Sequence, residues 1–219
     1  MKENYTVVYG LTADPIHKGH EQAIINGINY CHKHDLLIRK FILLPVFQPN
    51  LIDDKKRPVA AFTHRLAMCQ VLAQRLSKVL KTKIEVSAVE KQLSETTATI
   101  NTSFMTIQHL QKQNNSKQKY LFMVSADHFI GNQPKFKQWS HWQALVNICG
   151  LLINQRPNNK INAAFVEQLK TINSDIHCVN SPHQVDISSS QIRNSIQHYL
   201  GSEFISADIS QYLTKNHLY

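Results

Sequence analysis

Short apolar runs recur along the chain and alternate with segments of helical period. The runs do not alternate between apolar and polar positions, which is typical of strands that are buried on both faces. Turn-forming residues bound them at fairly even spacing. The pattern therefore predicts six strands, at Thr6–Gly10, Lys40–Leu44, Ile84–Val89, Tyr120–Ser125, Ile148–Ile153 and Ile176–Val179.

Four of the intervening segments place apolar residues at helical spacing. The residues on one face of each predicted helix are Ala23, Ile24, Gly27 and Ile28; Leu66, Cys69, Leu72, Ala73 and Leu76; Phe104, Ile107 and Leu110; and Phe165, Leu169 and Ile172. Strands separated by helices indicate a parallel sheet with crossover connections. We therefore expect an α/β fold with a doubly wound, mainly parallel sheet and helices on both faces. Such sheets bind ligands at the carboxyl ends of their strands, here after Gly10, Leu44, Ser125 and Ile153.

The chain has 219 residues, a length typical of one α/β domain. It contains no internal repeat and no linker long enough to separate two domains. We predict a single domain over residues 1–219, in which 187–219 form a C-terminal helical part. No apolar run approaches the ~20 residues that span a bilayer, and the start lacks the apolar core of a signal peptide. We therefore expect a cytoplasmic protein with no membrane partner.

Charge narrows the class of partner. The chain has 24 Lys and Arg against 15 Asp and Glu, a net charge of +9. A basic surface favours an anionic partner such as nucleic acid, anionic lipid or a phosphorylated small molecule. The four cysteines, Cys31, Cys69, Cys149 and Cys178, are too far apart for a CxxC pair or a local zinc site. We expect them to be buried thiols in a reducing compartment.

The first candidate site follows the first predicted strand, which leads through Pro15 into a helical pattern. Proline disfavours helix at the preceding residue, so the helix should begin near His17 or Lys18. His17 and His20 would lie on one face of its first turn, and Gly19 leaves room for a close approach to the backbone. A helix N-terminus presents unpaired N–H groups and the positive end of the helix dipole. Together these features predict an anion site.

The second candidate site is the segment Ile187–Arg193, which reads ISSSQIR. Ser188 is a good N-cap for a helical run that extends to Leu200. Ser189 and Arg193 are four apart and should share a face of that helix. By itself the segment is typical of a capped helix with a solvated arginine. Alongside the first motif it supplies a second helix N-terminus and a guanidinium, which suits a polyphosphate.

Together the two motifs resemble those of a known superfamily. HxGH after the first strand, with ISSSxxR on a late helix, is similar to the Rossmann-like nucleotidyltransferases that transfer AMP or CMP to a phosphate or related acceptor. Further landmarks resemble the nicotinate or nicotinamide mononucleotide adenylyltransferases: Ser125-Ala126-Asp127, the pair Trp139 and Trp142, Arg156-Pro157, and the segment from Tyr212 to Tyr219. The resemblance covers nearly the whole chain. It implies an enzyme of NAD biosynthesis that moves AMP from ATP to a pyridine mononucleotide and releases pyrophosphate.

The resemblance also implies which residues form the site. The catalytic residues would be His17, His20 and Arg193. ATP would be bound by Gly10, Thr12, His17, His20, Asp127, Ile187, Ser188, Ser189 and Arg193, and the mononucleotide by Ser103, Thr106, Trp139 and Arg156. Trp139 would stack beside the pyridine ring, although a buried tryptophan is more often a core residue. Mg²⁺ is expected on the ATP phosphates, with water as its other ligands and none from the chain.

Several positions depart from the family's pattern. Leu11 and Ala13 stand where the family usually has a second glycine and an aromatic residue. Pro49-Asn50-Leu51 replaces the Pro-His-Lys loop that helps to hold the acceptor, and Asn101-Thr102-Ser103 replaces the Ser-Tyr-Thr of the pyridine pocket. These changes bear on the choice of acceptor more than on adenylyl transfer.

We expect a preference for nicotinate over nicotinamide mononucleotide, because Ser103 and Thr106 would offer hydroxyls at a helix N-terminus to the nicotinate carboxylate. Three alternatives remain. The chain could be another adenylyl- or cytidylyltransferase, such as a phosphopantetheine adenylyltransferase, or an inactive homologue, which Leu11 and Ala13 would suit. A basic nucleic-acid-binding module is the third, but the charge is spread along the chain and no recognition-helix or RNP-like motif occurs.

Overall fold

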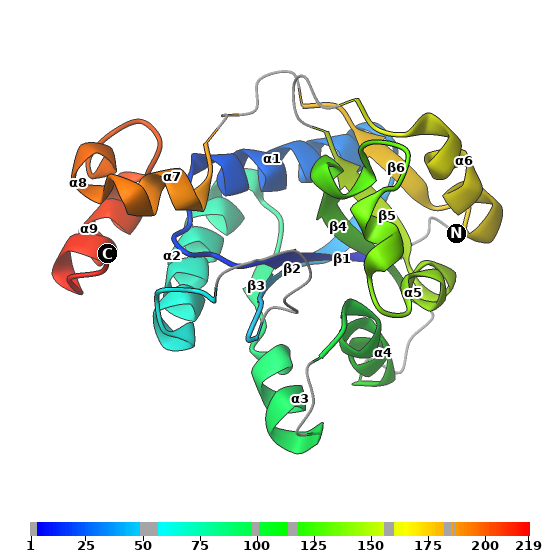
Figure 1. Ribbon diagram of the computed structural model, residues 1–219, viewed down its shortest axis with the longest axis horizontal. Coiled ribbons are helices and arrows are strands. Elements are labelled where there is room, and N and C mark those ends of the chain that lie inside the picture. Colours follow the sequence, from blue (N-terminus) through cyan, green and yellow to red (C-terminus); the bar gives the residue numbers. More distant parts are fainter. Residues whose placement is uncertain are drawn as a thin grey trace.

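The computed structural model describes residues 4–48, 57–97, 101–113, 118–155, 160–181, 185 and 187–219. Its centre is a six-stranded parallel sheet in the order β3-β2-β1-β4-β5-β6 (Figure 1). The strands are β1 Asn4–Leu11, β2 Leu37–Pro45, β3 Ile84–Val86, β4 Lys119–Ser125, β5 Gly150–Asn154 and β6 Ile176–Val179. The predicted doubly wound, parallel α/β sheet is confirmed.

Successive side chains of each central strand enter two separate apolar cores, one on either face of the sheet. On β1, Val7 packs in the first core and Val8 in the second, and both are fully buried. On β4, Leu121 and Phe122 divide in the same way. Because strand side chains point to opposite faces in turn, a sheet covered on both faces needs apolar residues at every position. This explains why the sequence shows continuous apolar runs.

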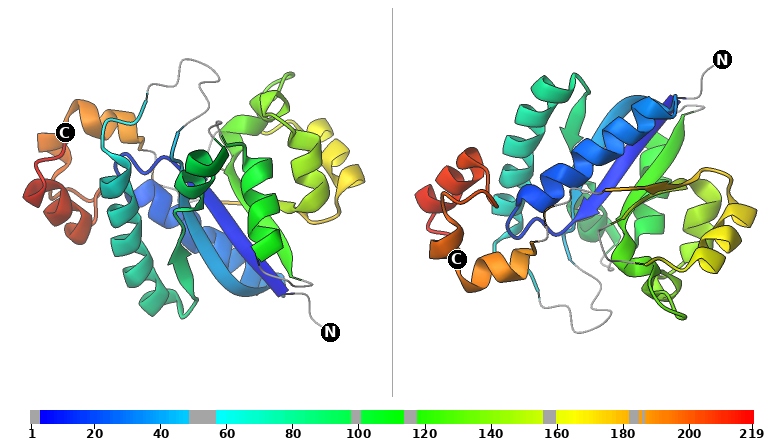
Figure 2. Two further views of the ribbon diagram at one scale, coloured as in Figure 1. Left: turned by 90° about the horizontal axis from the view of Figure 1, so that it is seen from below. Right: turned by 90° about the horizontal axis from the view of Figure 1, so that it is seen from above.

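Helices cover both faces. The first core contains residues of α1 Lys18–Lys33, α2 Phe62–Leu80, α7 Ser189–Asn194, α8 Ile196–Tyr199 and α9 Ala207–Lys215. The second contains residues of α3 Val89–Thr97, α4 Ser103–Gln113, α5 Trp142–Ile148, α6 Ala163–Ile172 and the 3₁₀ helices η1 Ala126–Phe129 and η2 Lys135–Gln138. Figure 2 shows α1, in blue, in front of the sheet in one view and green helices in front of it in the other. Within the described part of the chain, no helix is long and apolar enough to cross a membrane.

β1 and β4 lie side by side at the centre of the sheet, and the chain leaves them toward opposite faces. After β1 it enters α1, which packs in the first core, whereas after β4 it enters η1, which packs in the second. In open α/β sheets a crevice forms at such a point, outside the carboxyl ends of the two strands. Two of the predicted ligand-binding loops, those after Gly10 and Ser125, therefore follow neighbouring strands at the point where such a crevice is expected.

Some element boundaries differ from those predicted. The strand predicted at Ile84–Val89 is shorter, because α3 begins at its last residue, and the strand predicted at Ile148–Ile153 starts later, because Ile148 closes α5. The helical run predicted to Leu200 is broken at Ser195, where φ is −146°. A short apolar run does not distinguish a buried strand from the end of a buried helix, and this limits the boundaries that a sequence can give.

Candidate active site

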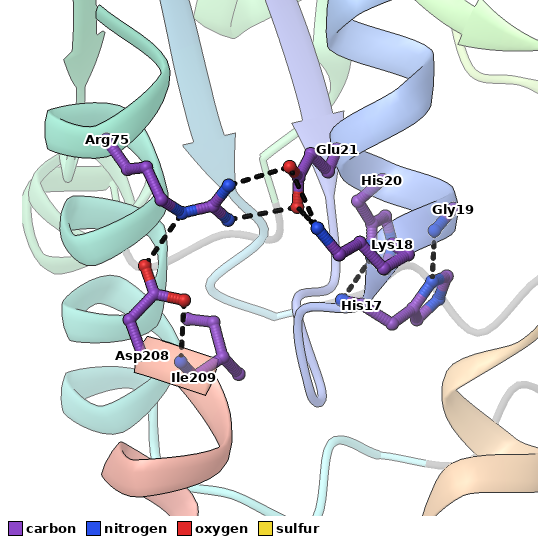
Figure 3. A network of polar contacts seen from close by, with 8 residues as sticks. All are labelled: His17, Lys18, Gly19, His20, Glu21, Arg75, Asp208 and Ile209. Carbon is purple, nitrogen blue, oxygen red and sulfur yellow. Dashed lines mark hydrogen bonds and ion pairs between the residues drawn. The ribbon is translucent and has the colours of Figure 1, made fainter. Parts of the chain in front are cut away.

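α1 begins with a histidine cap. His17 is the N-cap residue, and its Nδ1 accepts a hydrogen bond from the Gly19 N–H at 3.1 Å. Nδ1 of His20 accepts in turn from the His17 N–H at 3.3 Å (Figure 3). These bonds place the proton of each neutral ring on Nε2. The predicted helix start is confirmed, and the two imidazoles lie together with their ring centroids 3.8 Å apart.

Gly19 is required by this cap. A Cβ at position 19 would lie 2.9 Å from both Cε1 and Nδ1 of the His17 ring, well inside the normal separation of non-bonded atoms. A larger residue would therefore push the ring away from the amide that it caps. The HxGH spacing has a local structural reason, since two histidines close one helical turn and the glycine between them leaves room for the first ring.

The first turn of α1 does not present unpaired N–H groups, which corrects the expectation from sequence. The Lys18 N–H donates to the Phe204 carbonyl at 2.8 Å, and the Gly19 N–H donates to the His17 ring. The next two N–H groups both donate to the His17 carbonyl, at 3.0 and 3.3 Å. An anion at this helix end would be met by side chains and by the helix dipole rather than by free amides.

The start of α7 packs against the loop between β1 and α1. Ser188 is its N-cap, as predicted. The Ser189 hydroxyl donates to the Pro15 carbonyl at 3.0 Å, across 174 residues of sequence, and Arg193 donates to the carbonyl of Asp14. Ser189 and Arg193 therefore face the same way, as their spacing predicts. The two sequence motifs come together at this loop.

Asp14 lies at the centre of this junction. Its Oδ1 accepts hydrogen bonds from the Ala60 N–H at 3.0 Å and the Tyr219 hydroxyl at 2.5 Å. Its Oδ2 accepts from the Val59 N–H at 2.9 Å and lies 3.3 Å from Nη1 of Arg193. One buried carboxylate thus joins the segment before α2, the segment after α9 and α7. Sequence reasoning did not assign it a role, although an acidic residue inside a predicted anion-binding loop was an available signal.

Two buried ionisable side chains support the loops after β1 and β2. Arg65 donates to the carbonyl oxygens of Thr12 at 2.9 Å and Val46 at 2.6 Å, and burial lowers its pKa. Glu90 accepts from the Phe47 N–H at 3.0 Å. Burial raises the pKa of Glu90 to about 7, although that hydrogen bond and Arg65 oppose the shift. Sequence reasoning missed both residues; for Arg65 the signal was a charge in line with the apolar face of a predicted helix.

A charged network fixes α1 one turn after His17 (Figure 3). Glu21 accepts from both Nη atoms of Arg75, at 2.7 and 2.9 Å, and Nε of Arg75 donates to Asp208 at 2.8 Å. Nζ of Lys18 lies 3.1 Å from the second oxygen of Glu21. Burial acts to raise the pKa of Glu21, but Arg75 and Lys18 together hold it below its usual range. The network therefore joins α1 to α2 and α9 through ionised groups.

The segment after the carboxyl end of β4 contributes an acid and an aromatic cluster. Asp127 lies in η1, directly after β4, and accepts from the Ser125 hydroxyl at 3.1 Å. Trp139 follows η2 and packs edge-on against Phe122 and His128, with ring centroids 6.0 and 5.0 Å away. Trp139 is partly exposed. Its position is compatible with packing on one side and ligand contact on the other.

The residues predicted to bind the mononucleotide differ in accessibility. Ser103 begins α4 and is partly exposed. Thr106, in contrast, is fully buried, and its hydroxyl donates to the Thr102 carbonyl at 3.2 Å. The expectation that Thr106 offers its hydroxyl to a ligand is therefore corrected. Arg156 and the segment 49–51 lie outside the described residues.

The remaining predicted ATP-binding residues line the end of β1 and the start of α7. A Cβ at Gly10 would lie 3.3 Å from Cζ of Phe122, so a glycine relieves a close contact there. Thr12 is exposed in the loop that follows, and Ala13 beside it is buried with a left-handed φ of 58°. Ile187 is buried in the first core, so its side chain packs rather than binds.

Comparison with models of known protein families identifies the family of this chain. A model described as cytidylyltransferase-like matches residues 8–195. The chain belongs to the cytidylyltransferase-like family. Both motifs lie within the matched residues, and they are the parts of the chain that meet at Asp14 and Pro15.

The sequence similarity to individual relatives extends over almost the whole length of this chain. A Shewanella frigidimarina protein named "Probable nicotinate-nucleotide adenylyltransferase" is 25% identical over 230 residues, covering 97% of this chain and 98% of that protein. A Wigglesworthia glossinidia brevipalpis protein of the same name is 27% identical over 228 residues, covering 100% and 98%.

Two solved structures of Plasmodium falciparum nicotinic acid mononucleotide adenylyltransferase have a similar fold. The complex with APC has a TM-score of 0.70 at 18% identity and covers 98% of this chain and 96% of that one. The complex with NaAD has a TM-score of 0.72 at 20% identity, with 99% and 97% covered. At these identities the likeness shows the fold, and it agrees with the predicted Rossmann-like architecture.

Proposed function

We propose that this protein is an adenylyltransferase that moves AMP from ATP to nicotinate mononucleotide, forming the dinucleotide and pyrophosphate in NAD biosynthesis. The observation that carries the proposal is the junction of the two motifs. The imidazoles of His17 and His20 lie at the start of α1, and Arg193 reaches the same loop through the carbonyl of Asp14. The imidazole N–H groups at the start of α1 and the guanidinium of Arg193 on α7 then come together at the carboxyl end of β1, as a triphosphate requires.

The reaction requires charge stabilisation more than proton transfer. A phosphate oxygen of the mononucleotide, already ionised at pH 7, attacks the α-phosphorus of ATP. The bond from that phosphorus to the bridging oxygen breaks, and pyrophosphate leaves with the electron pair. No general base or covalent intermediate is needed. The protein's task is to align the two nucleotides and to offset charge on the phosphates in the transition state.

Different residues would offset the phosphate charge and align the two nucleotides. Nε2 of His17 and of His20 donates to the phosphates near the reacting centre, because Nδ1 of each ring is committed to the helix cap. Arg193 binds the β and γ phosphates. Asp127, after β4, binds ribose hydroxyls, and Trp139 contacts the pyridine ring. Stacking on that ring would contribute about 0.5–1.5 kcal/mol beyond burial.

The residues of this site suit a Mg²⁺ ion that is bound by the phosphates and not by the protein. The one carboxylate in the loop between β1 and α1, Asp14, has both oxygens engaged by donors within the chain. Within the described ranges, no cluster of three or more His, Cys, Asp or Glu residues is placed to hold a metal. We propose that Mg²⁺ is held by phosphate oxygens and water, where it offsets charge on the triphosphate.

Nicotinate mononucleotide is our proposed acceptor over the nicotinamide form. Ser103 stands at the start of α4, where a hydroxyl and the positive end of the helix dipole favour a carboxylate. The relatives described above are each named "Probable nicotinate-nucleotide adenylyltransferase", which supports this choice. With Thr106 buried, Ser103 is the remaining hydroxyl of the predicted pair. We place the reaction in the cytoplasm, where four cysteines without disulfide bonds are stable.

The test is pyrophosphate release from ATP and Mg²⁺ with a panel of acceptors: nicotinate mononucleotide, nicotinamide mononucleotide and phosphopantetheine. We expect kcat/KM to be highest for nicotinate mononucleotide, with formation of the dinucleotide. Turnover with phosphopantetheine alone would assign the protein to another adenylyltransferase activity, and a nicotinate to nicotinamide ratio at or below one would overturn the preference. No turnover with any acceptor would support an inactive homologue.

A further inference from the structure

Tyr219 contacts the proposed phosphate-binding residues through a shared carboxylate. Its hydroxyl donates to Oδ1 of Asp14 at 2.5 Å, across 205 residues of sequence. The other oxygen of Asp14 lies 3.3 Å from Nη1 of Arg193. Asp14 is only 1% exposed, so its charge is offset by these donors and by two backbone amides rather than by water. Whatever Tyr219 does to Asp14 is therefore transmitted to Arg193.

Arg193 has partners inside the chain and reaches the surface. It donates to the carbonyl of Asp14 and, at 3.0 Å, to the hydroxyl of Ser190. Its side chain is 21% exposed, so part of the guanidinium remains accessible to a ligand. The attraction of the Asp14 carboxylate acts against the attraction of bound phosphates. The balance depends on how far the other donors to Asp14 offset its charge.

We propose that Tyr219 is a positioning residue that sets how strongly Asp14 holds Arg193, and thereby how well Arg193 binds the β and γ phosphates of ATP. This inference rests on the role given to Arg193 in the proposed function. Burial and the bond to Asp14 both raise the pKa of Tyr219, so its hydroxyl remains a donor at neutral pH and well above it. Tyr219 thus offsets the Asp14 charge constantly.

Loss of the hydroxyl has a specific consequence. In Tyr219→Phe the ring still fills its place, but Oδ1 of Asp14 loses the hydrogen bond from the hydroxyl and keeps the one from the Ala60 N–H. The carboxylate then attracts Arg193 more strongly, because a buried charge with fewer hydrogen bonds interacts more strongly with nearby cations, here Arg193 and the fixed, buried Arg65. Binding of ATP weakens, whereas binding of AMP, which lacks the β and γ phosphates, does not.

The experiment compares ATP and AMP affinities by calorimetry for the wild type and Tyr219→Phe. Tyr212→Phe is the matched control, because Tyr212 lies on the adjacent α9 and its hydroxyl contacts Nδ1 of His64 at 3.0 Å. We expect about a tenfold weaker ATP affinity in Tyr219→Phe, equivalent to about 1.4 kcal/mol. The AMP affinity should stay within about twofold, and Tyr212→Phe should change neither.

A second comparison separates positioning from general structural support. In an Arg193→Met background, Tyr219→Phe should cause no further loss of ATP affinity, because the cation through which it acts is gone. Equal weakening of ATP and AMP, an additive loss in the Arg193→Met background, or the same effect from Tyr212→Phe would overturn the inference. So would a wild type that binds ATP no more tightly than AMP.

Two further points keep the outcome interpretable. If Tyr219→Phe does not fold, Tyr219→Met, which lacks a donor and adapts to irregular space, is measured with the same expectations. Affinities are measured without an acceptor, so they do not depend on which mononucleotide is used. Failure of every acceptor in the turnover assay, together with an intact ATP and AMP difference, would refute the proposed function and leave the role of Tyr219 standing.

Discussion

The guanidinium of Arg75 on α2 donates two hydrogen bonds to the carboxylate of Glu21 on α1, at 2.7 and 2.9 Å. Glu21 is the residue directly after His20, so this pair fixes the part of α1 that carries both histidines. Bidentate pairing restricts the relative orientation of two groups as well as their separation. The pair therefore positions the proposed phosphate-binding turn from behind, without touching the ligand.

Replacement of Glu21 by glutamine should lower the free energy of unfolding by about 1.5–3 kcal/mol, the range for a hydrogen bond that involves charged groups. The pKa of Glu21 is lowered in the folded protein, so its contribution is present above the ordinary value of 4.5 and is lost as the pH falls below it. Thermal unfolding of Glu21→Gln and the wild type at pH 7 and pH 4 measures this, and the difference should be larger at pH 7.

The control for this comparison is Glu167→Gln. Glu167 forms an exposed pair with Lys170 at 2.8 Å, three residues along α6, and such surface pairs contribute little. We expect its unfolding temperature to match the wild type at both pH values. A Glu21→Gln variant as stable as the wild type at pH 7 would show that the pair does not hold α1 in place.

Glu90 should have the opposite pH dependence. Its pKa is raised to about 7, so the folded protein retains a proton that the unfolded chain releases, and stability falls as the pH rises from about 4.5 to about 7. At about 1.36 kcal/mol per pKa unit, the full effect above pH 7 is about 3 kcal/mol. Glu90→Gln should therefore unfold at a higher temperature than the wild type at pH 8 and at a similar temperature at pH 5.

Glu95→Gln, on the exposed side of the same α3, controls for the general effect of removing a negative charge. It should leave the pH dependence of unfolding unchanged. A Glu90→Gln variant whose unfolding temperature follows the wild type between pH 5 and pH 8 would mean that Glu90 titrates normally.

Loss of His20 should reduce kcat by about 10²–10³, the effect of removing one preorganised donor to a transition-state charge. His20→Ala is compared with His32→Ala, which removes an exposed imidazole near the other end of α1. Steady-state kinetics with ATP and the preferred acceptor should show near-native turnover for the control. Near-native turnover in His20→Ala itself would exclude His20 from the reaction.

Trp139→Ala should raise the KM for the mononucleotide much more than the KM for ATP, because the partly exposed indole is proposed to contact the pyridine ring. Trp142, three residues on, packs edge-on against Phe136 and Phe165 and serves as the core-packing comparison. If Trp139→Ala raised both KM values equally, Trp139 would be a packing residue like its neighbour.

Much of the fold was readable from the sequence, since burial on both faces of the sheet makes each strand apolar throughout. The six strands were found, whereas α3 and α5 were missed. α3 reads VEKQLSETT and buries only Val89 and Glu90, so it lacks the apolar stripe that predicts a helix. α5 begins at Trp142. This segment was interpreted only through the pair Trp139 and Trp142, and no helix was predicted there.

The candidate site was predictable where its geometry is local. His17 with His20, and Ser189 with Arg193, are related by the spacing of one helical turn, which a sequence displays directly. The contacts of Asp14 with Tyr219 and of Arg65 with Thr12 join residues that only the folded sheet brings together. No spacing rule reaches across such distances, so these residues were found only in the structure.

The N–H groups in the first turn of α1 all have acceptors within the chain. This has a consequence for how nucleotide affinity can change through mutation. Main-chain N–H groups survive every amino-acid replacement except proline, so a site built on them tolerates most mutations. Here those amides are occupied by the Phe204 carbonyl and by His17, and in the proposed site the phosphates are bound by imidazole and guanidinium groups instead. Each of these groups can be removed or weakened singly, and their attraction for phosphate falls as ionic strength rises. Nucleotide affinity in this lineage should therefore be adjustable one side chain at a time, while the helix that carries the site keeps its shape.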